Sequence, residues 1–237
     1  MGMTTDVAVP STPDSPDSPD FLGLLDFSGL PESTQEQEKM LAGRIYDPAD
    51  PRLVALRVRS HNLSREYNGL DETDPRRQRI LQGWLDLQGE NVFLQGPVQF
   101  DYGCFTSIGE NSYANFNFTC LDCCPMTIGR NVFIGPNVSL LTPVHPLRFQ
   151  DRNLYRNARG QMTDHEYAKP IVISDNCWIA GNVTVCGGVT IGEGCVIGAG
   201  SVVTRDIPSG MVAFGDPCRP IRPITEEDGM SDLFEAE

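Results

Sequence analysis

The sequence is short of basic residues and of long apolar runs. No window approaches eighteen consecutive apolar residues, and the opening residues MGMTTDVAVP lack the basic and apolar regions of a secretory signal. We therefore expect no transmembrane helix, no signal peptide and a cytoplasmic location. Lys and Arg number 18 against 32 Asp and Glu, which gives a formal net charge of −14. This balance argues against binding to nucleic acid or to an acidic membrane.

The sequence also lacks the ligand pattern of a zinc site. It has eight cysteines but only one CxxC pair, Cys120 with Cys123, and no second pair to complete a tetrahedral site. We predict no metal, and without a secretory signal we expect reduced thiols. Cys177 and Cys195 stand eighteen residues apart, and we expect both to point into the core.

Residues 173–208 repeat every six residues. The first position is Ile or Val in all six blocks: Ile173, Ile179, Val185, Ile191, Ile197 and Val203. A helix of 3.6 residues per turn drifts out of phase with such a period, whereas a short strand followed by a Gly- or Asn-bearing turn fits each block. The period predicts an all-β solenoid, a parallel β-helix in which three blocks make one triangular coil.

The repeat begins earlier, at about residue 108, and is interrupted twice. Between Ala114 and Ile128 the step is fourteen residues instead of twelve, so we expect about two residues to bulge out near 122–125. The larger interruption, 141–169, has no periodic apolar positions. Long insertions in a solenoid usually project from one face and often bind ligands.

Helices are predicted ahead of the coils. Ser33 and Glu36 have capping-box spacing at the start of a helix that would reach residue 46. A second helix is expected from Leu53 to Tyr67, and a third after Asp74 as N-cap. Such helices would cap one end of the β-helix. The predicted divisions are a disordered Pro/Ser/Asp-rich tail (1–31), a helical region (32–90), the β-helix with its inserted loop (91–224) and an acidic tail (225–237).

His145 is the first candidate for catalysis. It lies in the inserted loop, and an imidazole titrates near neutral pH, as a general base requires. Residues in loops on a rigid scaffold are often catalytic. From spacing alone, a hydrogen-bonded surface histidine remains the alternative.

Several segments together resemble one enzyme family. They are EKMLAGRIYDPADPRL (38–53), YANFNFTCLDCCPMTIG (113–129), TPVHP (142–146), KPIVISDNCWIAGNVTV (169–185) and GVTIGEGCVIGAGSVVTRDIPSG (188–210). In combination they are similar to the hexapeptide sugar O-acetyltransferases, which include the maltose, galactoside and nodulation-factor enzymes. The resemblance extends over about 38–224.

The resemblance implies a homotrimer of left-handed β-helices with acetyl-CoA bound between subunits. His145 matches the family's catalytic histidine, which would take a proton from the acceptor hydroxyl as the oxygen attacks the thioester; no acyl-enzyme is expected. Matches on the acceptor side are Asp101, Asn115, Arg57 and Glu166, the last as a residue that could orient His145. Matches on the cofactor side are Trp178, Gly181, Ala199, Thr204, Arg205, Arg219 and Arg222.

The chain departs from the family pattern on the acceptor side. An acidic acceptor contact of the galactoside enzymes falls on Cys123, a second aspartate contact falls on Pro48 beside Asp47, and the loop after His145 is longer. The donor is therefore a firmer inference than the acceptor. The alternatives are an acetyltransferase for a non-sugar alcohol, a non-catalytic β-helix interaction subunit, and a β-helix carbonic anhydrase, which needs three converging histidines.

Overall fold

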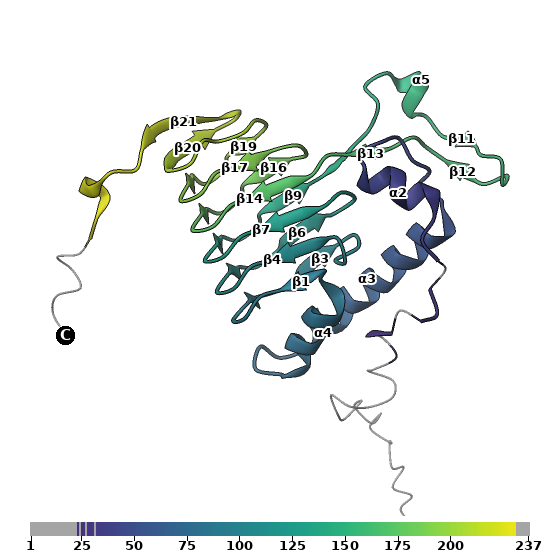
Figure 1. The fold of residues 1–237 in the computed structure, drawn as a ribbon, viewed down its shortest axis with the longest axis horizontal. Coiled ribbons are helices and arrows are strands. Elements are labelled where there is room, and N and C mark those ends of the chain that lie inside the picture. Colours follow the sequence, from purple (N-terminus) through teal and green to yellow (C-terminus); the bar gives the residue numbers. More distant parts are fainter. Residues whose placement is uncertain (1–22, 24, 27, 31, 231–237) are drawn as a thin grey trace, which may run out of the picture.

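The computed structural model describes residues 23, 25–26, 28–30 and 32–230, and most of these wind into a three-sided solenoid (Figure 1). Sheet A contains β1 (Leu87–Gln88), β4 (Thr106–Ile108), β7 (Met126–Ile128), β14 (Ile171–Ile173) and β17 (Thr190–Ile191). Sheet B contains β2 (Phe93–Leu94), β5 (Tyr113–Ala114), β8 (Phe133–Ile134), β15 (Trp178–Ile179), β18 (Val196–Ile197), β20 (Met211–Gly215) and β21 (Cys218–Pro223). Sheet C contains β3 (Val98–Phe100), β6 (Phe118–Leu121), β9 (Ser139–Leu141), β16 (Thr184–Cys186) and β19 (Val202–Val203).

The strand register confirms that three blocks make one coil. Ile173 pairs with Ile191 in sheet A, eighteen residues further along the chain. The same separation joins Val185 to Val203 in sheet C. The pairs within the coils are parallel, and only β20 and β21 pair antiparallel in the three sheets. The predicted fold, a left-handed parallel β-helix, is confirmed.

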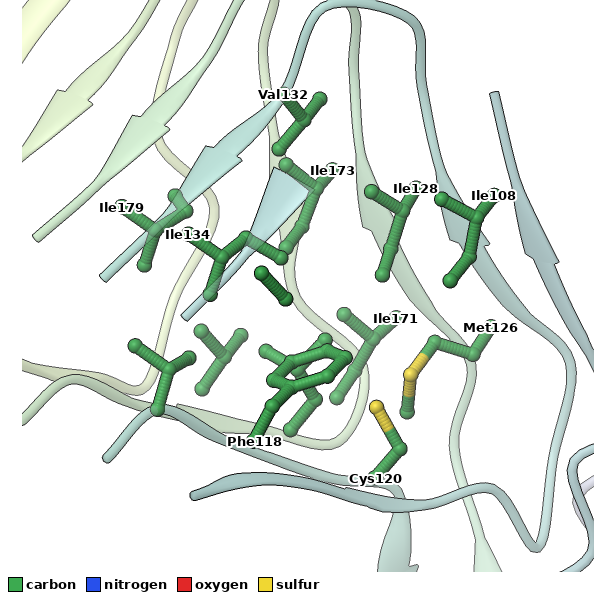
Figure 2. Packing of buried hydrophobic residues seen from close by; sticks show 14 of the residues in the cluster. Ile108, Phe118, Cys120, Met126, Ile128, Val132, Ile134, Ile171, Ile173 and Ile179 are labelled. Atoms are coloured by element: carbon green, nitrogen blue, oxygen red, sulfur yellow. The ribbon is translucent and has the colours of Figure 1, made fainter. Parts of the chain in front are cut away.

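The aliphatic positions of the repeat form rows inside the solenoid. Ile128 and Ile173 lie next to each other in sheet A, and Ile134 and Ile179 do so in sheet B (Figure 2). Each of these side chains is at most 3 % exposed. Cys177 and Cys195 are buried in the same core, as predicted, and all eight cysteines are free thiols in the structure.

Asparagines shape the corners between sheets A and B and between sheets B and C. Asn117, Asn137 and Asn182 occupy successive coils at the B–C corner, each with φ near +60°. Asparagine tolerates this left-handed conformation better than most residues. Their side chains also bond from coil to coil, Asn117 Nδ2 to Asn137 Oδ1 at 2.8 Å and Asn137 Nδ2 to Asn182 Oδ1 at 3.1 Å. The turn residues therefore stabilise the stacking of the coils.

The first helix differs from the prediction. Helix α2 spans Gln35–Leu41, and its N-cap is Thr34, whose Oγ1 accepts a bond from Gln37 N at 3.3 Å. The predicted capping box is wrong, because the Glu36 carboxylate instead accepts bonds from Lys39 Nζ and Asp47 N. The helix stops before residue 46, since Gly43 takes a left-handed φ of 68°.

The next two helices cap the N-terminal end of the solenoid, as predicted. Helix α3 (Pro51–Gly69) contains the predicted stretch. Helix α4 (Arg76–Trp84) has Pro75 as its N-cap, one residue after the predicted Asp74, although Asp74 Oδ1 accepts a bond from Arg76 N at 2.8 Å. Trp84 is fully buried and packs edge-on against Phe100 of β3, with ring centroids 4.9 Å apart. In Figure 1, α4 lies beside β1 and α3 beside β3.

Both interruptions of the repeat lie at the corner between sheets C and A. The extra residues near 122–125 lie between β6 and β7, where the interruption was expected, but Asp122, Cys123 and Cys124 are at most 3 % exposed and only Pro125 of the four is exposed. The two cysteines belong to a second apolar cluster with residues of α2 and α3, such as Met40 and Leu53. The helical region covers this corner and buries the extra residues.

The inserted loop 141–169 has a structure of its own. Strands β10 (Pro143–Val144) and β13 (Tyr167–Ala168) pair antiparallel at its base. Beyond them lie the short helix α5 (Phe149–Arg152) and a hairpin of β11 (Tyr155–Arg156) with β12 (Met162–Thr163). Figure 1 shows the loop projecting from the solenoid on the side of α2.

The two ends of the described chain make contacts with the rest. Leu25 and Leu30 pack against the two apolar clusters, although they lie in the segment predicted as a tail. The predicted acidic tail begins with a 3-10 turn, Glu226–Asp228, and Asp228 pairs with Arg222 at 2.6 Å. In the predicted tails, residues 1–22, 24, 27, 31 and 231–237 lie outside the described part. Within that part, no helix has the length and apolarity to cross a membrane.

Candidate active site

A cavity of about 530 Å³ opens at the C–A corner, between the helical region and the inserted loop. Four predicted site residues line it together: Arg57, Asp101, His145 and Glu166. Arg57 comes from α3, and Asp101 comes from the turn after β3. Three corner segments of successive coils, at Asp101, at Cys123 and in the inserted loop, therefore converge on one cavity.

The His145 ring has two oxygen atoms beside Nδ1. The carboxylate Oδ2 of Asp164 and the carbonyl oxygen of His165 each lie 3.5 Å from Nδ1. A proton on Nδ1 facing these acceptors leaves the lone pair of a neutral imidazole on Nε2. The side chain is 47 % exposed, so a small molecule can reach it. The ring can act as a base through Nε2.

Glu166, predicted to orient His145, contacts Tyr46 in this structure. Burial raises the pKa of Glu166, and hydrogen bonding from Tyr46 and the charge of His145 partly oppose this rise. The Glu166 carbonyl accepts a bond from Tyr46 N at 3.0 Å. Asp164 was not singled out from the sequence, because it lies nineteen residues after His145 in a loop without a repeat.

Asp101 and Arg57 form the polar side of the cavity near α3. Asp101 Oδ2 lies 3.5 Å from Cys123 Sγ, and its Oδ1 lies 3.8 Å from His61 Nε2. Burial raises the pKa of Asp101, although its contacts with Cys123 and His61 favour the charged form. Arg57 donates from Nη1 to the Tyr102 hydroxyl at 2.7 Å and from Nη2 to the Pro48 carbonyl at 2.8 Å. These bonds hold a guanidinium at the cavity.

Asn115 is not brought to this cavity. It follows β5 at the B–C corner, and its Oδ1 accepts a bond from Phe116 N at 2.7 Å. His145 instead leaves the solenoid at the C–A corner. The two residues therefore lie on opposite edges of sheet C within one chain.

The first three cofactor-side residues lie on sheet B and its corner with sheet C. Trp178 of β15 is 53 % exposed and pairs in register with Phe133, which is 55 % exposed. Gly181 and Ala199 follow on the B–C corner. A Cβ on Gly181 would meet Pro136 Cδ at 3.3 Å, so the backbone there packs tightly against the preceding coil.

The other four cofactor-side residues lie elsewhere. Thr204 and Arg205 are exposed at the C–A corner after β19, and Arg219 and Arg222 lie on β21. Arg222 is held by Asp228 through bonds of 2.7 and 2.6 Å. None of the seven cofactor-side residues lines the His145 cavity.

The three histidines have separate partners. His61 lies on α3 beside Asp101, whereas the His165 ring stacks on Tyr155, with ring centroids 4.5 Å apart. Over the described residues, no group of three or more His, Cys, Asp or Glu side chains is arranged to hold a metal ion.

Comparison with known proteins matches both parts of the chain. Residues 39–86 match the maltose acetyltransferase hexapeptide capping motif, and residues 170–205 match the bacterial transferase hexapeptide of six repeats. The galactoside O-acetyltransferase of Escherichia coli is 40 % identical over 192 residues, which covers 81 % of this chain and 90 % of the relative. The chain belongs to the hexapeptide-repeat sugar O-acetyltransferase family.

Solved structures of relatives match this acetyltransferase over most of its length. A maltose O-acetyltransferase from Clostridium difficile has a TM-score of 0.74 and 39 % identity, over 82 % of this chain and 100 % of its own. A hexapeptide-repeat acetyltransferase from Vibrio cholerae, complexed with acetyl coenzyme A, has a TM-score of 0.70 and 35 % identity, over 81 % and 100 % of the two chains. The predicted enzyme class, an acetyltransferase, is confirmed.

Proposed function

We propose that this acetyltransferase moves the acetyl group of acetyl-CoA to a hydroxyl of a sugar or glycoside, with His145 as general base. The observation that carries the proposal is the cavity in which His145 lies with Arg57, Asp101 and Glu166. A base, a cation and two carboxylic acids around one space suit a ligand with several hydroxyls, because each hydroxyl both donates and accepts hydrogen bonds.

The proposed chemistry is a direct transfer. Nε2 of His145 takes the proton of the acceptor hydroxyl while its oxygen bonds to the thioester carbonyl carbon. The bond from that carbon to sulfur then breaks, and the thiolate leaves and takes the proton from the imidazolium. The products are an acetyl ester and free CoA. Burial raises the pKa of the Cys123 thiol in this cavity, which keeps it protonated and unsuited to a covalent route.

Cationic side chains support CoA as donor. Arg205, Arg219 and Arg222 are exposed on the distal coils of a protein with a net charge of −14. Guanidinium groups bind phosphates well, and CoA carries phosphates at its nucleotide end. The Vibrio cholerae relative, which matches 81 % of this chain, is complexed with acetyl coenzyme A.

The separation of the predicted residues supports a homotrimer. Asn115, Gly181 and Ala199 lie at the B–C corner, whereas His145 and Arg205 lie at the C–A corner. Three copies around an axis parallel to the solenoid can place the B–C corner of one subunit against the C–A corner of the next. Each active site would then contain residues of two subunits. We also place the enzyme in the cytoplasm, where its eight free thiols would stay reduced.

The test is release of free CoA from acetyl-CoA in the presence of maltose, methyl β-galactoside or a non-sugar alcohol. We expect turnover with a sugar acceptor and a loss of roughly 10²-fold or more in His145→Ala. His165→Ala is the matched control, because it removes the other imidazole of the loop, and it should retain most activity. Equal turnover by wild type and His145→Ala would overturn the proposed base. A protein that sediments as a monomer and is fully active would overturn the proposal that each active site contains residues of two subunits.

A further inference from the structure

Asp47 links the helical region to the inserted loop. It lies between α2 and α3, and its Oδ1 accepts bonds from Thr163 Oγ1 at 2.7 Å and from Ala49 N at 3.0 Å. Its Oδ2 accepts bonds from Asn157 Nδ2 at 2.8 Å and from Arg159 Nη2 at 2.9 Å. Three of the four donors belong to the loop, more than one hundred residues further along the chain.

The segment that these donors hold is the β11–β12 hairpin, residues 155–163. Only two residue pairs join its strands, Tyr155 with Thr163 and Arg156 with Met162. A hairpin this short has little stability of its own in water. Its attachment to Asp47 therefore fixes its position relative to α3.

The hairpin forms part of the wall of the cavity around His145. Leu154, Met162 and Thr163 line the cavity together with Pro48 and Ala49, the two residues that follow Asp47. Leu154, just before the hairpin, and Met162 within it are 66 % and 52 % exposed, so the part of the cavity that they line is open to an acceptor. Asp47 itself does not line the cavity.

We infer that Asp47 is a positioning residue that holds the 155–163 hairpin in place as a wall of the acceptor site, and so determines which acceptors fit. The inference rests on the proposed function for its effect on the acceptor, but the anchoring of the hairpin does not. The extra length of the loop after His145 thereby gains a role: it builds a wall, and Asp47 holds that wall.

The chemistry of the contact requires a carboxylate. Both oxygens of Asp47 accept two bonds each, and Arg159 adds a positive charge. In Asp47→Asn only one oxygen remains, and the amide NH₂ would face two donors. The variant keeps the size of the side chain but loses up to two of the loop contacts and the charge that they share.

The experiment compares Asp47→Asn with Asp175→Asn as a matched control. Asp175 also accepts bonds from a backbone N–H and an arginine, those of Arg130, but lies at the A–B corner away from the cavity. Hydrogen exchange of the 155–163 amides should rise by roughly tenfold or more in Asp47→Asn and stay unchanged in the control. With maltose or methyl β-galactoside, KM for the acceptor should rise by roughly tenfold while KM for acetyl-CoA stays within about twofold.

Each outcome decides a separate point. Unchanged hydrogen exchange over 155–163 in Asp47→Asn would show that Asp47 does not anchor the hairpin. Faster exchange with an unchanged KM for the acceptor would show that the hairpin is not a wall of the acceptor site. An equal rise in both KM values, or a general loss of stability, would indicate a structural role alone. A wild-type protein that transfers acetyl to no acceptor would overturn the proposed function and with it the effect on specificity, whereas the exchange measurement would still report on the anchor.

Discussion

Asp164 Oδ2 lies 3.5 Å from Nδ1 of His145, within the same inserted loop. The carboxylate is partly shielded, with 26 % of its side chain exposed. A negative charge next to an imidazole stabilises the positive charge that the ring gains when it takes a proton. Asp164 is therefore the side chain best placed to assist His145, the proposed general base.

Replacing Asp164 with Asn should lower kcat with little effect on KM for acetyl-CoA. The amide keeps the shape of the side chain but not the charge that stabilises the imidazolium in the transition state, so we expect kcat to fall roughly tenfold. Steady-state kinetics with a saturating acceptor would measure this. Asp151→Asn is the control, because Asp151 lies in the same loop and pairs with Arg148 at 3.5 Å on the surface. A similar loss in both variants would contradict a specific role for Asp164.

Replacing Arg205 with Gln should weaken the binding of acetyl-CoA and leave the binding of the acceptor unchanged. If Arg205 contacts a phosphate of CoA, its loss should raise KM for acetyl-CoA by roughly tenfold, and added salt should reduce the difference between variant and wild type. The acceptor KM should not change. Arg130→Gln removes another exposed arginine, at the A–B corner beside Asp175, and serves as the control. An unchanged acetyl-CoA KM in Arg205→Gln would remove this residue from the CoA site.

The stability of the protein should depend on pH through Asp122. This side chain is fully buried, and burial raises its pKa to about 6, although Tyr102 N and Thr106 Oγ1 donate hydrogen bonds to it. Between about pH 4 and pH 6 the folded state therefore holds a proton that the unfolded state has lost. The contribution of Asp122 to the free energy of unfolding is full below pH 4 and decreases by about 3 kcal/mol as the pH rises through 6.

The variant Asp122→Asn cannot titrate, so its free energy of unfolding should fall less between pH 4 and pH 7 than that of the wild type. Denaturant unfolding across this range measures the difference between the two proteins, which removes the contribution of the other acidic residues. Parallel pH profiles would show that Asp122 does not carry this dependence.

Replacing Asn137 should separate the two roles of the corner asparagines. In Asn137→Ala the residue loses its bonds to Asn117 and Asn182 and places a Cβ without compensation at a φ of 58°, so the free energy of unfolding should fall by about 2 kcal/mol. Asn137→Gly loses the same bonds but adopts this φ freely, so it should be less destabilising. Thermal unfolding of both variants measures this, and a glycine variant as unstable as the alanine variant would contradict the role of φ.

The sequence predicted the solenoid well because the six-residue period is a local property. Each block places Ile or Val at the same point, and strands eighteen residues apart in the chain pair in the next coil, as Ile173 does with Ile191. The helical stretch at Leu53–Tyr67 was also predicted from a local pattern. The first helix was less well predicted, because Glu36 bonds to Asp47, a partner eleven residues away that a capping rule does not include.

Short, repeated sequence patterns are enough to predict the coils, the aliphatic rows that fill the core and the family to which the chain belongs. The positions of the two interruptions and their contacts depend on the folded chain. Folding places both interruptions at one corner and buries Cys123 beneath the helices. It also brings Asp164 to His145 and joins Asp47 to Arg159 across 112 residues. It also left Asn115 on the other edge of sheet C. Such contacts depend on which surfaces pack together once the chain is folded, and no local period encodes them.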